Sequence, residues 1–456
     1  MKQRHVLHLY WRAGFGLKPK ELLTVSEQSK ETVVNDLFQE SRDIVPLEKD
    51  LSYLKFYPQS TLKNSKDKRM ELLSRNREET RILNTIWLKR LETTPRVLRE
   101  RMTLFWANHF VCKDLATNHI LKYNTTLRTH ALGNFGDFVK AISKEASMIK
   151  YLNLNQNKKD SPNENFAREL LELFTLGEGN YTEQDIKECS RAFTGYHYKF
   201  DGSFRYIRVR HDNGSKKFFG ETGRFDGDDI IDIILSQKQC AKHICEKIYA
   251  YFVNSDIKED HINRMVEVFY GDYDIEKLMR FVFSSDWFYD DINIGTKIKS
   301  PIDLLIGIHR LVPVYFTKSN ELYRLQNLLD QFLLFPPNVA GWKGGKYWIT
   351  TNSLMLRIKL PSMILEKESY TYQYRGNLKN LRIVSVKNKY QEKLTVYVDW
   401  KKYRKSVKKV SLNTLKDTLI LCDINQGTKR YISGFGKRPS KKNLVKLMSL
   451  PEYQMC

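Results

Sequence analysis

The chain has 456 residues, of which 41% are hydrophobic and 12% aromatic, and its 76 Lys and Arg against 53 Asp and Glu give a formal net charge of +23. This hydrophobic share excludes a disordered or fibrous chain, and the length suits about three domains or one large helical domain with additions. No apolar run approaches the roughly 18 residues of a membrane-spanning helix, so we do not expect an integral membrane protein.

The N-terminal residues lack the apolar stretch of a secretory signal peptide. The early cations Lys2 and Arg4 are soon followed by Trp11 and Gly14. The six cysteines include no C-x-x-C pair, which favours reduced thiols over a disulfide framework. We therefore expect a cytoplasmic protein; the alternative is a cell-envelope protein, or one exported together with a partner.

Helical periodicity dominates residues 1–371, for which we predict a mainly α, multi-helix globular body. Apolar residues recur with helical spacing in the stretches 79–91, 97–109, 134–151, 163–174, 183–194, 228–236, 241–252, 275–283 and 321–332.

The pattern changes within about 197–225, where aromatic and basic residues are interleaved with glycine, as in 200–206. This composition predicts a β-hairpin or an irregular insertion in the helical body.

A second change follows Lys367. From there to the last residue the chain has 21 Lys and Arg against 6 Asp and Glu, a net charge of +15. Apolar residues alternate in 381–386 and 394–400, which is typical of strands. We therefore predict a small basic β-rich module at 372–436. A closing helix near 441–449, within 437–456, would then belong to the body.

Residues 161–177 contain the signals for the start and the end of one helix. Ser161 is a candidate cap, Pro162 suits the first helical position, and Glu164 would complete an S-x-x-E capping box. Gly177 is placed to end the helix.

The polar side of this predicted helix holds three candidate catalytic residues, Arg168, Glu169 and Glu172. A solvated face in so lysine-rich a chain would be expected to carry lysines, whereas this one carries carboxylates, an amide and one arginine. The composition indicates the wall of a site. The structural alternative is a cap with ordinary i,i+4 ion pairs, which stabilise a helix by about 0.2–0.5 kcal/mol each.

His211 and Asp212 lie side by side in a predicted loop and complete the candidate catalytic set. An imidazole and a carboxylate can transfer protons or bind a metal. His109 ends an apolar helix, where a histidine is more often a core residue than a ligand. We take Glu169, His211, Asp212 and His109 as candidate ligands of a divalent metal, the one cofactor that we consider.

The same stretches carry a family resemblance. They run in order through nearly the whole chain, and include 8–16, 105–110, 148–153, 162–177, 181–183, 191–195, 211–214, 299–301, 336–342 and 451–454. In these stretches the sequence resembles the bacterial domain-of-unknown-function family numbered 1800.

The resemblance implies no particular activity. It implies a secreted or envelope-associated protein whose gene lies beside that of a phosphatase- or sulfatase-like protein, and it therefore makes such a protein a candidate partner. Ala107 departs from the family's W-H-N-H pattern, which puts a metal role for that helix end in doubt.

Three functions remain open. One is a metal-assisted or general acid/base hydrolase with its site on the 162–177 helix and the 211–214 loop. The usual hydrolase signatures are absent, which favours the second, a non-catalytic scaffold for the phosphatase-like partner. The third is polyanion or nucleic-acid binding by basic residues with interleaved aromatics. The candidate polyanion-binding residues are Lys401, Lys402, Arg404, Lys405, Lys408 and Lys409.

Overall fold

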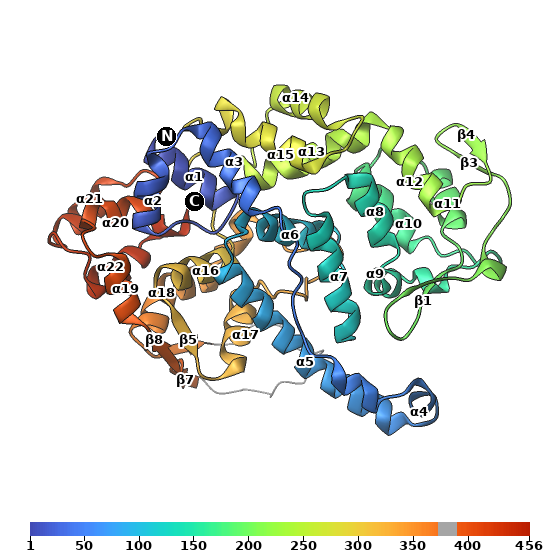
Figure 1. Cartoon of the computed structure of the whole chain (residues 1–456), viewed down its shortest axis with the longest axis horizontal. Coiled ribbons are helices and arrows are strands. Elements are labelled where there is room, and N and C mark those ends of the chain that lie inside the picture. Colours follow the sequence, from blue (N-terminus) through green and yellow to red (C-terminus); the bar gives the residue numbers. More distant parts are fainter. Residues whose placement is uncertain (373–389) are drawn as a thin grey trace.

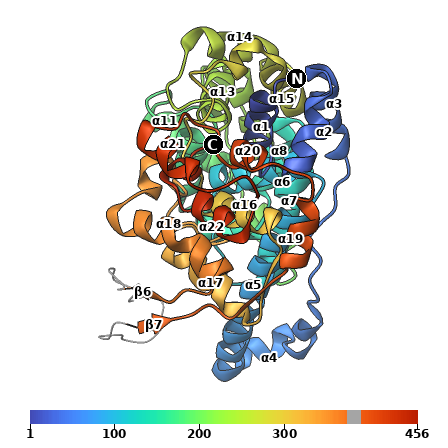
Figure 2. The same cartoon turned by 90° about the vertical axis from the view of Figure 1, so that its left-hand side faces the viewer.

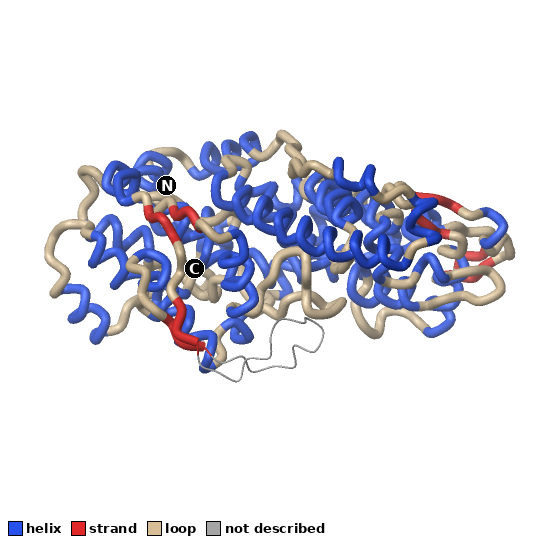
Figure 3. The backbone as a smooth tube through the Cα atoms, turned by 90° about the horizontal axis from the view of Figure 1, so that it is seen from below, coloured by secondary structure: helices blue, strands red, loops and turns tan. Residues whose placement is uncertain are grey.

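The computed structural model describes residues 1–372 and 390–456, and the chain is mainly α-helical, as predicted. The molecule is longer than it is wide. The two chain ends lie close together toward one end, and the hairpins of the insertion lie at the other (Figure 1 and Figure 3). Among the described residues, no helix is both long and apolar enough to cross a bilayer.

The first third of the chain is built around α6, in which twelve of thirteen residues are buried. Because α6 is enclosed on all sides, its charged residues must find partners inside the protein. The helices of this part are α1 (Gln3–Arg12), α2 (Pro19–Ser26), α3 (Lys30–Glu40), α4 (Gln59–Asn64), α5 (Lys66–Thr93), α6 (Val97–His109), α7 (Thr117–His130), α8 (Phe135–Ser143) and α9 (Ala146–Tyr151).

The middle of the chain adds a second series of helices, most of which share the main apolar core with the first, while α18 packs in a second cluster. They are α10 (Asn165–Glu169), α11 (Glu183–Ala192), α12 (Gly227–Ser236), α13 (Lys238–Phe252), α14 (Glu259–Phe269), α15 (Ile275–Ser284), α16 (Pro301–Leu311), α17 (Ser319–Leu328) and α18 (Thr351–Leu365). Single helical turns of other types are η1 (Ser52–Phe56), η2 (Leu154–Gln156), η3 (Leu170–Thr175), η4 (Arg208–Arg210), η5 (Asp286–Tyr289), η6 (Gly345–Trp348) and η7 (Pro451–Gln454).

The predicted 161–177 helix begins later than expected. The backbone of Ser161 pairs with Lys158 in an isolated bridge, so Ser161 cannot cap, and the predicted capping box is wrong. Helix α10 starts at Asn165 and widens into η3, a π-helical turn. The predicted end is confirmed, because Gly177 has a φ of 84°, which glycine adopts without strain.

The insertion contains two antiparallel hairpins, which confirms the β-hairpin prediction for 197–225. The first pairs β1 (Tyr196–Tyr198) with β2 (Phe204–Tyr206), and the second pairs β3 (Lys216–Phe218) with β4 (Glu221–Gly223).

The C-terminal segment is less rich in strands than predicted. Strand β5 (Val314–Phe316) pairs with β8 (Val396–Val398), and β6 (Tyr370–Tyr372) pairs with β7 (Tyr390–Glu392). The described remainder is helical, with α19 (Trp400–Ser406), α20 (Leu412–Leu419), α21 (Gln426–Ser433) and α22 (Lys441–Met448). The predicted closing helix is confirmed as α22, whereas the strand expected at 381–386 lies outside the described residues.

Capping explains why the strand predicted at 394–400 ends early. Leu394, Val396 and Val398 are buried in alternation, as expected of a strand with one face covered. The Asp399 side chain then accepts a hydrogen bond from the Lys402 backbone N–H, which starts α19.

A second apolar core joins the C-terminal segment to the body. Leu304 and Ile308 of α16 pack in one cluster with Leu415 of α20 and Leu444 of α22, and the C-terminal helices lie on one side of α16, in front of it in Figure 2. The last residues add a β-bridge between Ile298 and Met455. The basic segment is therefore held against the body by buried contacts.

Candidate functional site

The polar stripe of α10 and η3 lies at the surface, in contact with α11. The guanidinium of Arg168 donates hydrogen bonds of 3.2 and 3.1 Å to the two carboxylate oxygens of Glu183, and lies 3.5 Å from Glu164. The bond to Glu183 raises the pKa of Arg168. The Arg168 side chain is 41% exposed, so this arginine is engaged in a solvent-facing ion pair.

Glu169 and Glu172 are half-buried neighbours on the same stripe. Burial, and then the charge of Glu172, raise the pKa of Glu169. The hydroxyl of Tyr181 donates a hydrogen bond of 3.2 Å to Glu172 Oε2. Burial and the adjacent Glu172 raise the pKa of Tyr181 to about 12. A carboxyl group whose pKa is raised by burial and by a neighbouring negative charge keeps its proton more readily, which suits a general acid.

The His211–Asp212 pair is held by the end of α11. His211 is buried, with Nδ1 3.0 Å from the Thr194 carbonyl oxygen, and the Asp212 backbone N–H donates 2.8 Å to Thr194 Oγ1. The Asp212 carboxylate accepts from Arg191 Nε at 2.7 Å and from the Gly214 N–H at 2.7 Å. Burial opposes ionisation of Asp212, but these bonds keep its pKa below the ordinary value.

The stripe and the His-Asp pair meet opposite ends of α11. Arg168 contacts Glu183 at the first residue of this helix, whereas Asp212 contacts Arg191 near its last. Eight residues of helix separate the two contacts by about 12 Å. Within the described part of the chain no hydrogen bond or ion pair joins the two sets. The structure therefore places the five candidate catalytic residues in two separate clusters.

His109 is a core residue. It is 8% exposed, and its Nε2 lies 3.1 Å from the carbonyl oxygen of Phe174 among several aromatic rings. Burial lowers its pKa well below the ordinary value. Among residues 1–372 and 390–456, no group of three His, Cys, Asp or Glu side chains is arranged to hold a metal ion.

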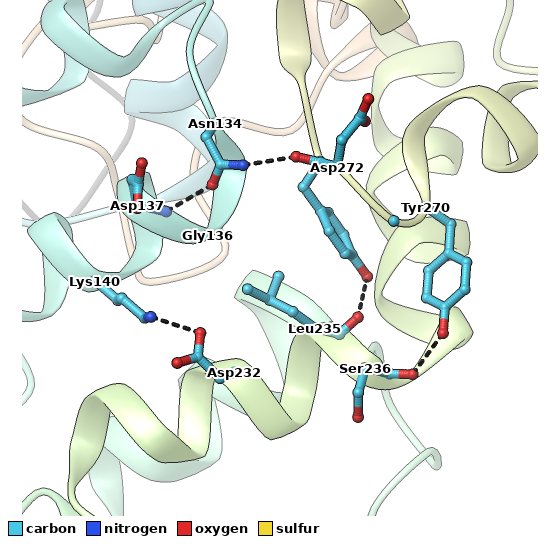
Figure 4. Close-up of a pocket in the computed structure, with 11 residues that line it drawn as sticks. Asn134, Gly136, Asp137, Lys140, Asp232, Leu235, Ser236, Tyr270 and Asp272 are labelled. Atoms are coloured by element: carbon cyan, nitrogen blue, oxygen red, sulfur yellow. Dashed lines mark hydrogen bonds and ion pairs between the residues drawn. The ribbon is translucent and has the colours of Figure 1, made fainter.

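A pocket of about 430 Å³ lies between α8, α12 and the 270–273 loop (Figure 4). Its polar groups bind one another across the gap. Asn134 Nδ2 donates to the Asp272 carbonyl, Lys140 pairs with Asp232, and the Tyr273 hydroxyl donates to the backbone of helix α12. Because these polar groups already bind one another, they are not free to bind a ligand, and the pocket is a junction between packed elements.

The basic face is the name we give to the exposed cations of α19 and the turn that follows it. Tyr403 and Val407 are buried and anchor this segment, whereas the cations before, between and after them are exposed. Only Lys402 lies near an acid, with Nζ 3.9 Å from Asp399; within the described residues no ion pair reaches the other cations. The members of the basic face are Lys401, Lys402, Arg404, Lys405, Lys408 and Lys409.

Two exposed tyrosines adjoin the basic face. Tyr315 and Tyr397 are directly opposite each other in the β5–β8 pair, with ring centroids 6.0 Å apart, and are 48% and 60% exposed. Lys402 Nζ lies 3.2 Å from the Tyr315 hydroxyl. Lys402 thus joins the tyrosine pair to the basic face.

A third group consists of buried charged side chains that were not predicted from the sequence, and we call it the buried charge cluster. Arg101 Nη2 lies 2.6 Å from Asp303 Oδ1, and both side chains are at most 5% exposed. Lys299 Nζ donates 2.7 Å to the Tyr453 carbonyl and lies over its ring, 3.8 Å from the centroid. We define the cluster as Arg12, Arg101, Lys297, Lys299, Asp303 and Arg357.

The buried charge cluster gathers positions from both ends of the chain. Arg357 donates from Nη2 to the Lys299 carbonyl at 2.6 Å and from Nε to the Gln454 side chain at 3.0 Å. Arg12 donates to the Asn293 carbonyl at 2.9 Å. Two members of the cluster, Arg12 and Lys299, lie in the stretches 8–16 and 299–301, and Gln454, which contacts Arg357, lies in 451–454. Contacts between residues so distant in sequence could not be predicted without a structure.

The family assignment fits this arrangement. The family model described as "Protein of unknown function (DUF1800)" matches residues 8–455, and so includes both chain ends and the insertion. The chain belongs to the DUF1800 family. No curated protein and no solved structure is similar enough to match it.

Proposed function

We propose that this DUF1800 protein binds single-stranded nucleic acid through the basic face and the Tyr315–Tyr397 pair. The supporting observation is that six exposed cations lie on one segment, and that one of them, Lys402, contacts the exposed Tyr315 ring beside Tyr397. Exposed cations bind phosphates and release counterions, while aromatic rings stack on unpaired bases. A polyanion without bases would use the cations but would gain nothing from the rings.

The test is fluorescence anisotropy with a labelled 20-nucleotide single strand, the matching duplex and heparin. We expect the single strand to bind tightest at equal salt, with an affinity that falls steeply as salt rises. The Lys401→Glu/Lys405→Glu double variant should weaken binding at least tenfold. Lys66→Glu, at the exposed start of α5, reverses a charge far from this surface and should change little.

Binding that ignores salt, or that the double variant leaves unchanged, would refute this function. If heparin bound as tightly as the single strand and competed with it, the basic face would be a general polyanion site and the tyrosines would have no role.

A second candidate is the acid/base hydrolase, and what supports it is the half-buried Glu169–Glu172 pair with its raised Glu169 pKa. Turnover of acidic polymers should then fall at least 100-fold in Glu169→Gln. Glu178→Gln, an exposed change nearby, is the control. Unchanged turnover and metal content in Glu169→Gln and His211→Ala would remove this candidate.

A phosphatase- or sulfatase-like partner also stays a proposal, and its support is the family resemblance alone. Co-purification with the product of the neighbouring gene is its test.

A further inference from the structure

A second pocket, of about 690 Å³, lies between the body and the basic segment. It is lined by the end of α5, the end of α16 and strand β5, with α17 and α19 at its edges. The apolar part of its wall consists of Leu88, Pro313, Val314, Phe316 and Leu322.

Cations outnumber acids around this pocket. Lys18, Lys89, Arg310 and Lys402 line it together with the acid Glu92, and Glu21 lies near Arg310 and pairs with Lys18. Lys89 is exposed, and within residues 1–372 and 390–456 no hydrogen bond or ion pair reaches its ammonium group. Arg310 Nη1 lies 3.4 Å from the Glu92 carbonyl, and burial lowers the pKa of this arginine. The lining itself therefore has more cations than acids.

A buried imidazole lies at the back of the pocket. His309 is 2% exposed, and its ring lies 5.5 Å from that of Phe316. Its Nδ1 is 3.4 Å from Glu92 Oε2, whereas its Nε2 has no hydrogen-bond partner among the described residues. Since buried polar atoms are nearly always hydrogen-bonded, this nitrogen is available to a polar group that enters from the pocket.

We propose that this pocket binds an aromatic anion, that is, a flat apolar ring that carries a phosphate or carboxylate. The ring would lie between Leu88, Phe316 and Leu322, and the anionic group would lie at Lys89, Arg310 and Lys402. Apolar walls with a few convergent polar groups are the usual composition of a small-molecule site, and paired cations recognise such anions.

The pocket shares Lys402 with the basic face and Tyr315 with the adjoining tyrosine pair. Even so, this inference goes beyond the proposed function and does not depend on it, because an aromatic anion can bind whether or not a strand does.

Calorimetric titration of the full chain with 1-naphthyl phosphate tests the inference, with 1-naphthol and inorganic phosphate as the two halves of the ligand. The whole molecule should bind at least tenfold tighter than either half. Lys89→Glu should weaken the binding of 1-naphthyl phosphate about tenfold, which corresponds to about 1.4 kcal/mol. Thr85→Trp, which fills the pocket without changing charge, should weaken it further.

Lys66→Glu is the matched control, because it reverses a charge on the same helix α5, about 35 Å away along the axis. No binding of 1-naphthyl phosphate, or equal affinities in Lys89→Glu, Thr85→Trp and Lys66→Glu, would overturn the inference. Adenosine monophosphate distinguishes the sources: binding as tight as 1-naphthyl phosphate indicates a nucleotide, and weaker binding another aromatic anion.

Strand binding is measured in separate titrations. If the full chain binds 1-naphthyl phosphate but no single strand, only the nucleic-acid proposal is refuted. If it binds a single strand but no 1-naphthyl phosphate, only the aromatic-anion proposal is refuted.

Discussion

The buried charge cluster and the basic face use the same side chains in opposite ways. In the cluster, Arg101 and Lys299 are fully enclosed and contact a carboxylate, carbonyls and ring faces. On the basic face, Lys405 and Lys408 lie in water, and no ion pair reaches them within the described residues. A buried charge must be compensated or it destabilises the fold, whereas an exposed one is free to meet a ligand. The chain's positive charges therefore lie in two distinct environments, one compensated inside the fold and one exposed to solvent.

The largest effect should come from removal of the cluster's carboxylate. Asp303→Asn keeps the size of the side chain but leaves Arg101 without its counter-charge, and should lower the free energy of unfolding by about 3–5 kcal/mol. Urea unfolding measures this change. Asp286→Asn breaks the Lys30–Asp286 pair, in which the acid is 99% exposed, and should leave stability nearly unchanged. Equal losses in both variants would erase the difference between the two regions.

The next effect concerns the exposed rings beside the basic face. Tyr397→Ala should weaken single-strand binding by about 1–3 kcal/mol, the range for loss of one stacked base. Tyr270→Ala removes a 40% exposed tyrosine elsewhere and should leave the affinity unchanged. Anisotropy titrations at constant salt give both numbers. If the two variants lost the same affinity, stacking at Tyr397 would have no part in binding.

Sequence patterns gave the helical class, the hairpins and the C-terminal helix, because these depend on neighbours within a few residues. The apolar spacing of 441–449 is a local property, and α22 has nearly these bounds. The start of α10 was not predictable in this way, since the bridge between Ser161 and Lys158 prevents the expected cap. Nothing local indicated the π-helical turn that follows.

The candidate sites differ in the same way, since some depend on neighbouring residues and others on contacts between residues far apart in the sequence. The exposure of the basic face follows from lysines placed between buried apolar residues such as Tyr403, so this exposure could be predicted from the sequence. The Arg101–Asp303 pair joins residues 202 positions apart, and only the fold brings them together. The separation of Arg168 from Asp212 was equally hidden, because it depends on which end of α11 each one meets.

Stability should also depend on pH. Burial lowers the pKa of Lys297 and of Lys299 to about 7. An unfolded lysine keeps its proton up to about pH 10.4, so between these values the unfolded chain binds more protons than the folded one. The free energy of unfolding should therefore rise with pH from about 7.5 to 9, by about 1.4 kcal/mol per unit for each lysine.

Lys297→Met should remove that residue's share of the pH slope. Urea unfolding at several pH values measures it, with Lys66→Met, an exposed change, as the reference. A slope that is the same in Lys297→Met and in the unaltered chain would show that Lys297 stays charged, as the Tyr251 ring 3.7 Å from its Nζ would favour.

The smallest effect should come from one cation of the basic face. Lys405→Ala removes a single phosphate contact, so the slope of log affinity against log salt should become shallower by about 0.7. The affinity itself should fall less than tenfold. Lys66→Ala should leave the slope unchanged, and an unchanged slope in Lys405→Ala would place this residue outside the bound strand's path.

Photocrosslinking tests the central claim most directly. A single strand with 5-bromouracil at several positions is irradiated with the full chain, and the attached peptides are identified by mass spectrometry. The account predicts attachment to Tyr397 or Tyr315, and loss of that attachment at high salt. Attachment confined to the hairpins at the opposite end of the molecule, or none at any position, would contradict it.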